Sequence, residues 1–326
     1  MGHRPLGRDT RRLRPQITDA LRATSCAAAG FGAAESISER AETAFRAWLA
    51  VGNHADMAYL ERHAVLRLHP QSVLPGVRTV ISLAFRFPRP EQPGPVAAYA
   101  LGRNYHKAIN SAVKPLVVTL RQLGATARVA IDSAPIAERY WAVRSGIATP
   151  GRNGMALVSG CGPYAFLCEV LTDLDLADQP PYLPYGPPPA CTGCGACVRA
   201  CPTGALRPDG TLDARRCLSY LSIEHNGPIA PLTLSYQPSA LGYFPLLGCD
   251  RCLSACTLGR NASAPILRDL RPRPEIAVLT PEQVLNMTDD ELDALTAGTS
   301  LRRPGTDGLR RNARLNISIR QAVEKN

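Results

Sequence analysis

Eight of the eleven cysteines in this chain of 326 residues lie between positions 191 and 256. The first four follow the spacing C-x2-C-x2-C-x3-C-P, which is typical of segments that hold [4Fe–4S] clusters. Three closely spaced thiolates can bind three corners of one cubane, whereas the fourth cysteine of such a run binds the other cluster. The spacing therefore predicts one cluster on Cys191, Cys194, Cys197 and Cys256, and a second on Cys201, Cys217, Cys249 and Cys252.

Two other uses of these cysteines are a disulfide framework and a structural zinc site. A chain of this length can bury a core of its own and does not depend on disulfides. Zinc sites usually show two separated C-x2-C pairs, whereas this run has three short steps and ends in Cys201-Pro202. The remaining cysteines, Cys26, Cys161 and Cys168, are predicted to be small buried residues.

Composition indicates an ordinary globular protein, with 45% hydrophobic and 20% charged residues. The net charge of +10 is concentrated at the two ends of the chain. Residues 1–22 carry six Arg against two Asp, and residues 301–326 carry seven basic against two acidic residues. Such ends suit a polyanion such as RNA, and they equally suit solubilising termini.

The sequence predicts a cytoplasmic protein that makes no contact with a membrane. No apolar run is long enough to span a bilayer, and no uninterrupted apolar stretch follows the Arg11-Arg12 pair. Thiols stay reduced in the cytoplasm and are available there to bind iron.

Alternating patterns predict an α+β fold in which an α/β domain comes first. Residues 1–22 look disordered or weakly helical. Helices are expected over 37–60, with a stop at Gly52-Asn53, over 108–123 and through 141–144. Strands are expected over 79–87, 127–131 and 155–159, and residues 165–174 are either a strand or a short helix. Thr280 and Thr288 each open a capping-box pattern, which predicts two short helices near the end.

Five segments follow from these patterns and from six prolines between residues 177 and 190. They are a basic extension (1–24), an α/β domain that must hold a second redox centre or the substrate (25–176), a proline-rich linker (177–190), a ferredoxin-like domain with two clusters (191–262), and a helical C-terminal element with a basic tail (263–326).

From about residue 25 onward the chain resembles the epoxyqueuosine reductases of tRNA modification. The resemblance rests on the order and spacing of several short motifs and on the eight-cysteine pattern. These motifs are Gly52-x-His54-Ala-Asp-Met57-x-Tyr59, Arg67-x-x-Pro70, Leu74-Pro75-Gly76, Tyr99-Ala-Leu-Gly102-Arg103-Asn104-Tyr105-His106-Lys107, Asp132-Ser-Ala-Pro135-Ile-Ala-Glu138-Arg139, Gly151-Arg152-Asn153, Glu169-x-Leu171-Thr172-Asp173, Cys217-x-Ser219-Tyr220-Leu-x-Ile223-Glu224-His225 and Arg310-Arg-Asn312-Ala.

The resemblance implies an enzyme that uses cobalamin in addition to the two clusters. Electrons would pass from the clusters to cobalt, and the epoxide of epoxyqueuosine at the tRNA wobble position would become an alkene, with release of water. An acidic residue supplies a proton in this family, and the matching position is Asp132. The implied cofactor contacts are Arg67, Tyr105, His106, Asp132, Arg152, Asn153, Ser219 and Asp250. The implied partners are tRNA that carries epoxyqueuosine and a small redox donor protein of the ferredoxin or flavodoxin type, and the enzyme is expected to be a monomer.

The sequence departs from the family pattern at four positions. Asn104 stands where an Asp is common, Arg152 where a Lys is common, Thr257 where a Pro is usual, and Ala97 where one family pattern has a cysteine. Many members carry longer C-terminal repeats that contact RNA, and here the Arg-rich tail is expected to substitute for them in part.

Several structural alternatives remain open from the sequence. Asp132 follows a strand and precedes an expected helix, so it could serve as an N-cap. Tyr105 and His106 could simply pack at a helix start, and Arg67 and Arg152 could face water.

Two competing functions are a corrinoid iron–sulfur reductase of a small molecule, similar to the reductive dehalogenases, and a ferredoxin-type electron carrier. A carrier has no need of the long domain that precedes the cysteines.

Overall fold

A four-stranded sheet organises the N-terminal part of the protein in this computed structural model, which describes residues 10–177, 190–229 and 242–325. The strands run in the order β1-β2-β6-β3, and each pairing is antiparallel. They are β1 (Ala28–Ala33), β2 (Thr79–Arg86), β3 (Ala127–Ala130) and β6 (Ala165–Thr172). β4 (Ala148–Pro150) and β5 (Ala156–Val158) form a separate pair. The predicted mixed fold is confirmed, and residues 165–172 are a strand.

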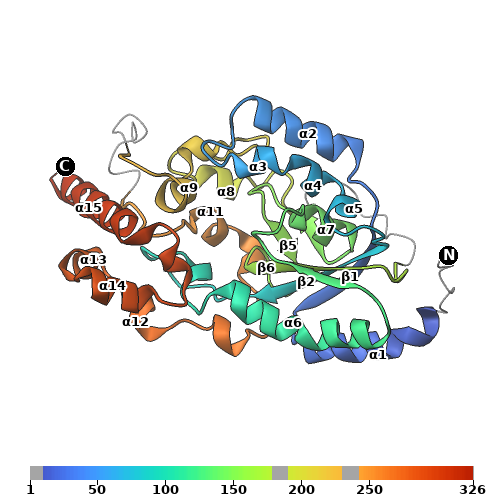
Figure 1. Cartoon of the computed structure of the whole chain (residues 1–326). Coiled ribbons are helices and arrows are strands. Elements are labelled where there is room, and N and C mark those ends of the chain that lie inside the picture. The colour runs from blue at the N-terminus through green and yellow to red at the C-terminus, as the bar shows by residue number, and fades with distance from the viewer. Residues whose placement is uncertain (1–9, 178–189, 230–241, 326) are drawn as a thin grey trace.

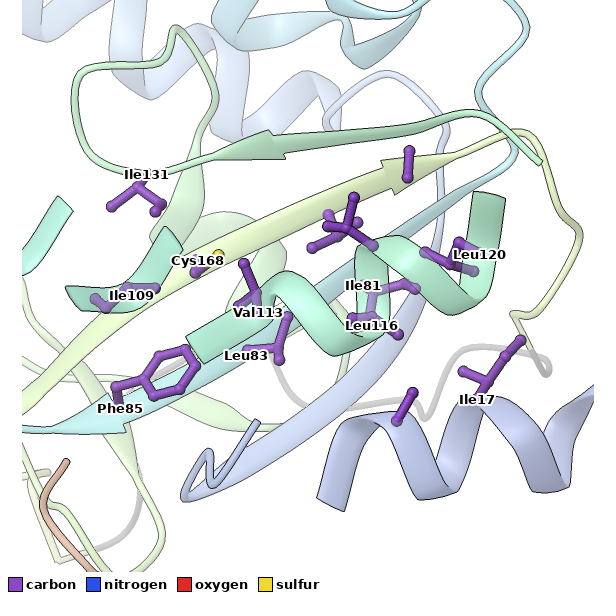
Figure 2. Close-up of a cluster of buried hydrophobic side chains, with 14 of the residues drawn as sticks. Ile17, Ile81, Leu83, Phe85, Ile109, Val113, Leu116, Leu120, Ile131 and Cys168 are labelled. Atoms are coloured by element: carbon purple, nitrogen blue, oxygen red, sulfur yellow. The ribbon is translucent and has the colours of Figure 1, made fainter. Parts of the chain in front are cut away.

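One face of the sheet packs against two helices, α6 (Tyr105–Gln122) and α1 (Thr10–Ala23). Figure 2 shows how Val113, Leu116 and Leu120 of α6 meet apolar side chains of the central strands β2 and β6. The 3.6-residue spacing of these side chains places them on one side of the helix, and burying them stabilises it. The predicted helix over 108–123 is thus confirmed.

The segment expected to be disordered or weakly helical contains a packed helix from residue 10 onward. In α1 the side chain of Ile17 is 1% exposed and lies in the core with α6. The apolar residues of this segment are few, and the partner that buries them is about a hundred residues away. The sequence pattern alone therefore did not predict this packed helix.

The other face of the sheet is covered by α7 (Glu138–Arg144) (Figure 1). Beyond it lie α2 (Glu39–Ala50), α3 (Tyr59–Arg62), α4 (Ala64–Leu68) and α5 (Pro70–Val73). The long helical pattern over 37–60 ends early because Gly52 adopts a left-handed conformation, with φ of 70°. The stop predicted at Gly52-Asn53 is confirmed.

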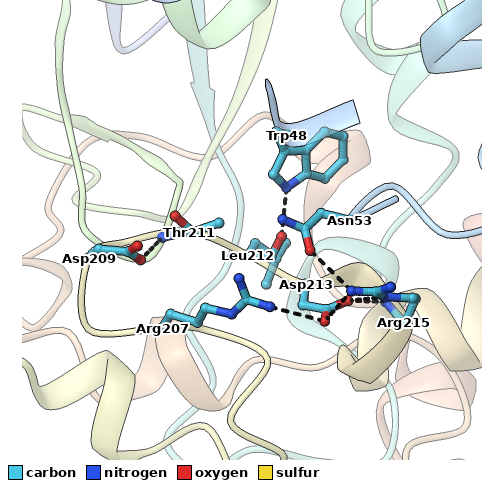
Figure 3. A network of polar contacts seen from close by, with 8 residues as sticks. All are labelled: Trp48, Asn53, Arg207, Asp209, Thr211, Leu212, Asp213 and Arg215. Atoms are coloured by element: carbon cyan, nitrogen blue, oxygen red, sulfur yellow. Dashed lines mark hydrogen bonds and ion pairs between the residues drawn. The ribbon is translucent and has the colours of Figure 1, made fainter. Parts of the chain in front are cut away.

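The cysteine-rich segment consists of short helices joined by turns. They are α8 (Ala196–Arg199), η2 (Ala214–Arg216), α9 (Leu218–Ile223), α11 (Arg251–Ser254) and η3 (Thr257–Gly259). A polar network ties this segment to the end of α2 (Figure 3). The Trp48 indole N–H donates to the Leu212 carbonyl at 2.6 Å, and the Arg215 guanidinium joins Asp213 to the Asn53 side chain.

The C-terminal part forms a helical layer at the opposite end of the molecule from α1 (Figure 1). It contains η4 (Arg268–Leu270), α12 (Pro274–Ala277), α13 (Pro281–Asn286), α14 (Asp289–Thr296), η5 (Ser300–Arg302) and α15 (Gly305–Glu324). Both capping boxes predicted at Thr280 and Thr288 are present, with reciprocal bonds to Gln283 and Glu291.

The last helix, α15, is fastened to the cysteine-rich segment. The Asn312 amide, which is fully buried, donates to the carbonyls of Ser222 and Leu246 at 2.8 Å each. Arg311 donates to the carbonyls of Leu221, His225 and Gly227. These bonds make α15 part of the folded body.

The five-segment division of the chain stays a prediction, and most of the proline-rich linker lies outside the described residues. Within the described ranges, no helix has the length and apolarity that crossing a membrane requires.

Candidate active site and iron–sulfur centres

The cysteines predicted to bind the first cluster surround one cavity. Cys191, Cys194 and Cys197 lie in the turn and helix around α8, and Cys256 comes immediately before η3. All four line a small hollow of about 20 Å³ that opens partly to solvent. Gly195, at the start of α8, has φ of 61°, so the chain can fold closely around this hollow. The arrangement is that of a site for one compact inorganic group.

The other four cysteines gather at a second place. Burial raises the pKa of the Cys252 thiol, and the nearby sulfurs of Cys249, Cys217 and Cys201 raise it further. Burial also raises the pKa of Cys249, to about 12. Bound iron supplies the positive charge that buried thiolates require. Cys197, from the first set, also raises the pKa of Cys252, so the two sets of cysteines lie next to each other.

Backbone N–H groups point at sulfur atoms of both sets. The N–H of Arg152 donates to Cys191 Sγ at 3.4 Å. The backbone N–H groups of Tyr220 and Ser219, in the first turn of α9, favour the thiolate of Cys217. Hydrogen bonds to cluster sulfurs are one means by which a protein sets a cluster's reduction potential. Within the described part of the chain, no three His, Cys, Asp or Glu side chains converge as ligands of a single metal ion.

Two residues predicted as corrinoid contacts, Arg152 and Asn153, line the first cysteine cavity. The Arg152 side chain also donates to the Pro208 carbonyl at 3.0 Å. Asn153 is buried, and its Oδ1 accepts the N–H of Met155 at 3.2 Å. The structure thus places this pair beside the first set of cysteines, and the next residue, Gly154, accepts a hydrogen bond from Arg139, which follows Glu138.

Asp132 lies on a loop between β3 and α7, in the left-handed conformation with φ of 47°. Its Oδ2 accepts the Tyr105 hydroxyl at 2.5 Å and lies 3.5 Å from His106 Nε2. Its own N–H donates to Glu138 Oε1. The side chain is 60% exposed, so a substrate can reach its carboxyl group.

The alternative role of Asp132 as a helix cap does not hold. Helix α7 begins at Glu138, its N-cap is Ala137, and residues 132–137 are turns. The prediction that a helix starts directly after Asp132 was therefore wrong. After β3 the chain makes a turn at residues 132–133 and bends over 134–136 before α7 begins at Glu138.

Tyr105 and His106 begin α6 beneath Asp132. Asn104 caps this helix, its Oδ1 accepting the N–H of His106 at 3.0 Å, so the amide here performs the capping that an Asp would. The Tyr105 ring stacks on Phe166, with centroids 4.5 Å apart. Burial, followed by the Asp132 charge, raises the pKa of Tyr105, which keeps the phenol protonated as a donor. Burial lowers the pKa of His106, which favours the neutral imidazole.

Arg67, on α4, approaches the same loop from the other side. Its Nη1 donates to the Ile136 carbonyl at 3.3 Å. Its pKa is lowered by burial, and the charges of Tyr59, Glu138 and Asp132 act against that effect. Arg67 therefore belongs to the Asp132 site and does not simply face water.

Asp250 connects the second set of cysteines to the Asp132 site. It follows Cys249, is 5% exposed, and its Oδ2 accepts the N–H of Ala98 at 2.6 Å. Burial raises its pKa to about 6, and the bond from Ala98 opposes this shift. The next residue is Tyr99, whose ring lies edge-on to Tyr105, with centroids 6.1 Å apart. The second set of cysteines is therefore linked to Asp132 through Asp250, the Ala98–Tyr99 segment and Tyr105.

Ala97, where one family pattern has a cysteine, packs closely against Gly248. Gly248 has φ of 71°, and a Cβ built there would lie 2.5 Å from the Ala97 Cβ. The two backbones approach so closely that a side chain at 248 is excluded.

Sequence reasoning gave no role to three residues around this site: Tyr99, Glu138 and Glu169. Glu169 had a visible signal, since it is a charged residue in the middle of an otherwise apolar strand pattern. Cys161 and Cys168 are buried as predicted, whereas Cys26 is half-buried.

Two family models match the chain. A 4Fe-4S double cluster binding domain matches residues 190–259, and a model of the epoxyqueuosine reductase QueG matches residues 67–133. The chain thus carries a double [4Fe–4S] cluster domain. The matched region includes all eight predicted ligands.

Curated relatives named epoxyqueuosine reductase are similar over most of this chain. The protein from Gloeobacter violaceus is 32% identical over 92% of this chain and 94% of its own length. The protein from Salmonella typhimurium is 34% identical over 81% of this chain and 69% of its own length.

Solved structures share the fold. A crystal structure of epoxyqueuosine reductase with an epoxyqueuosine-modified tRNA stem loop superposes with a TM-score of 0.82, at 22% identity, over 97% of this chain and 84% of the other. The enzyme from Bacillus subtilis, with its catalytic loop swung out of the active site, gives 0.80 at 22% identity, over the same shares of both chains. From its curated relatives, this chain belongs to the epoxyqueuosine reductase family.

Proposed function

We propose that this protein reduces the epoxide of epoxyqueuosine in tRNA to the alkene of queuosine. The reaction consumes two electrons and two protons and releases the epoxide oxygen as water. Its curated relatives carry this activity in their name. The observation that carries the proposal is the Asp132 carboxyl, which is exposed, held by Tyr105, and linked through Ala98 and Asp250 to the second cluster.

Asp132 is the proposed acid. Opening an epoxide leaves an alkoxide, which departs readily only when it is protonated. A carboxylic acid aimed at that oxygen contributes roughly 10²–10⁴ in rate. Tyr105 holds the carboxyl from one side, and the turn at residue 132 presents it to the substrate.

Cobalamin is the proposed second cofactor, and buried polar atoms near Asp132 fit it. His106 Nε2 and Arg67 Nε are buried and have no hydrogen-bond partner within the described residues. Such donors suit the amide-rich edge of a corrinoid, because a buried polar group without a partner is costly. Arg67, Tyr105, His106 and Asp250 are the residues proposed to hold it. When bound, cobalamin would supply the reducing centre that acts on the epoxide.

The two clusters are proposed to act in sequence. The first borders a solvent-open cavity, which suits electron entry from a small ferredoxin or flavodoxin type donor. The second adjoins Asp250 and hence the Asp132 site. Ser219 and Arg152 are therefore proposed to contact the clusters through their N–H groups.

A tRNA carrying epoxyqueuosine is the proposed substrate. Of the arginines in the basic tail, several already have partners within the protein. Arg311 is used internally, in bonds to three carbonyls. Others form ion pairs: Arg302 with Asp293, Arg303 with Glu224, and Arg310 with Asp289. Arg314 is exposed and remains a candidate for phosphate contact. A monomer in the cytoplasm, where tRNA and reducing conditions meet, completes the proposal.

The test uses protein reconstituted anaerobically with iron, sulfide and cobalamin. Absorbance should show a cobalamin band beside the broad iron–sulfur band. Turnover with modified tRNA and a low-potential chemical reductant, which supplies the two electrons, should yield queuosine by nucleoside mass spectrometry. Protein that holds clusters and cobalamin yet leaves epoxyqueuosine tRNA unchanged would contradict the proposal. Clusters without any cobalamin binding would favour a plain electron carrier.

A further inference from the structure

A glutamate lies in the middle of the central sheet without a partner. Glu169, on β6, is fully buried, and neither carboxyl oxygen has a hydrogen bond within the ranges that the structure describes. It sits opposite Ser82 on one neighbouring strand and Ala130 on the other. Burying an unpaired carboxylate costs much free energy, so a carboxyl at this position either is neutral or has a functional role.

The position of Glu169 in the strand shows which face it occupies. The residues on either side of it, Cys168 and Val170, belong to the core under α6. Since successive side chains of a strand point to opposite faces, Glu169 faces α7. The helix covering it carries Trp141, Ala142 and, at its first position, Glu138.

Glu138 is the link between this buried carboxyl and the Asp132 loop. Its Oε1 accepts the backbone N–H of Asp132. Burial raises the pKa of Glu138 to about 8, and the Asp132 charge adds to this while Arg139 and Arg67 oppose it. Burial raises the pKa of Glu169 well above its ordinary value, and the Glu138 charge raises it further. Two such carboxyls cannot both ionise cheaply.

We propose that Glu138 is a positioning residue that holds the Asp132 loop through its backbone N–H, and that Glu169 is kept as a neutral carboxylic acid beneath it. The left-handed conformation at Asp132 is unfavourable for a residue other than glycine, so the surroundings must hold it. Tyr105 holds the side chain and Glu138 holds the backbone. An ionised Glu169 would disfavour the ionised form of Glu138, whose carboxylate is the stronger acceptor for the Asp132 N–H. The inference rests on the proposed role of Asp132.

The first experiment replaces Glu138 by residues of similar size. Glu138→Gln keeps an oxygen that accepts the Asp132 N–H, whereas Glu138→Met does not. Losing one such hydrogen bond should lower kcat roughly tenfold in the Met variant, with KM for tRNA and iron content unchanged, while the Gln variant stays within about twofold of wild type. Hydrogen exchange of the peptide covering residues 130–137 should speed up only in the Met variant.

Glu35→Met is the matched control. Glu35 pairs with Arg144 at the opposite end of α7, at 3.1 Å, and does not touch the loop. It should change neither kcat nor loop exchange. If Glu138→Gln is as impaired as Glu138→Met, or if loop exchange is the same in both, the positioning role is wrong.

The second experiment asks whether Glu169 is neutral. Infrared difference spectra of Glu169→Gln against wild type at neutral pH should show one protonated carboxyl band in wild type that the variant lacks, with activity retained. A wild-type protein without that band, or a variant that loses activity while keeping its clusters, would overturn the neutral assignment. Exchange and infrared measurements need no substrate, so an inactive wild type would count against the proposed function alone.

Discussion

The iron–sulfur region and the Asp132 site differ in how the chain assembles them. All eight predicted cluster ligands come from one stretch between residues 191 and 256, and short helices and turns suffice to gather them. The residues of the Asp132 site come from α4, α6, the loop after β3, and the contact between Ala98 and Asp250. These segments lie far apart in the sequence, and only the folded sheet brings them together. A metal centre can be built from local spacing, whereas a proton-donating site depends on long-range packing.

Because the cluster ligands form two sets, removing one ligand should damage one cluster and leave the other in place. Cys256→Ala should damage the cluster on Cys191, Cys194 and Cys197, and Cys217→Ala should damage the other. Each variant should fall from about eight iron atoms per chain toward about four, and turnover should be lost, because both clusters are needed. Iron and sulfide analysis, with electron paramagnetic resonance of the reduced proteins, measures this. A loss of all iron in both variants would show that the two sets form one cooperative unit.

The Asp132 site should instead respond to small changes in its packing partners. Tyr105→Phe removes the hydroxyl that donates to Asp132 Oδ2 and keeps the ring stacked on Phe166. Loss of one hydrogen bond to a carboxyl should slow turnover by about tenfold while both clusters remain. Steady-state kinetics and iron content check this together, and an unchanged kcat would remove Tyr105 from the site.

The buried carboxyl of Glu169, in the sheet beneath the Asp132 loop, should make the free energy of unfolding depend on pH. The pKa of Glu169 is raised in the folded protein, so the fold keeps a proton that the unfolded chain releases above pH 4.5. Its contribution is therefore fully present below about pH 4.5 and is lost as pH rises toward the folded value, at up to about 1.4 kcal/mol per pH unit. Glu169→Gln should be more stable than wild type at pH 8, and its stability should depend less on pH. Thermal unfolding from pH 6 to 8.5 tests this, and equal slopes would mean that Glu169 is not neutral in the fold.

The smallest effects are expected on the tail. Arg311→Gln should destabilise the protein by about 1–3 kcal/mol, because three carbonyls lose their donor, and should leave the salt dependence of tRNA binding nearly unchanged. Arg314→Gln should leave stability unchanged and reduce the salt slope of tRNA binding by nearly one. Binding titrations at several salt concentrations separate the two, and the reverse pattern would contradict this division of roles.

Features set by neighbouring residues were predictable from the sequence. The run Thr79–Arg86 is a strand because it is apolar and β-branched, and Thr280 and Thr288 cap helices through bonds to residues three positions on. The cysteine sets likewise follow from spacing.

Features set by distant partners were not predictable in the same way. The antiparallel order of the sheet, the packing of α1 and the late start of α7 depend on contacts far along the chain. Asp132 illustrates both cases. The resemblance to the family identified the residue, whereas its left-handed conformation and the hydrogen bond from Tyr105 could be seen only in the structure.

The most direct measurement is single-turnover reduction of epoxyqueuosine tRNA by Asp132→Asn, compared with wild type. Asn preserves the shape of the side chain and can accept the Tyr105 hydroxyl, but it cannot donate an acidic proton. We expect a variant that folds and keeps both clusters and cobalamin binding, yet reacts roughly a hundredfold or more slowly. A variant with near wild-type rate would show that the proton comes from another group, and one that loses cobalamin or fails to fold would show that Asp132 is structural.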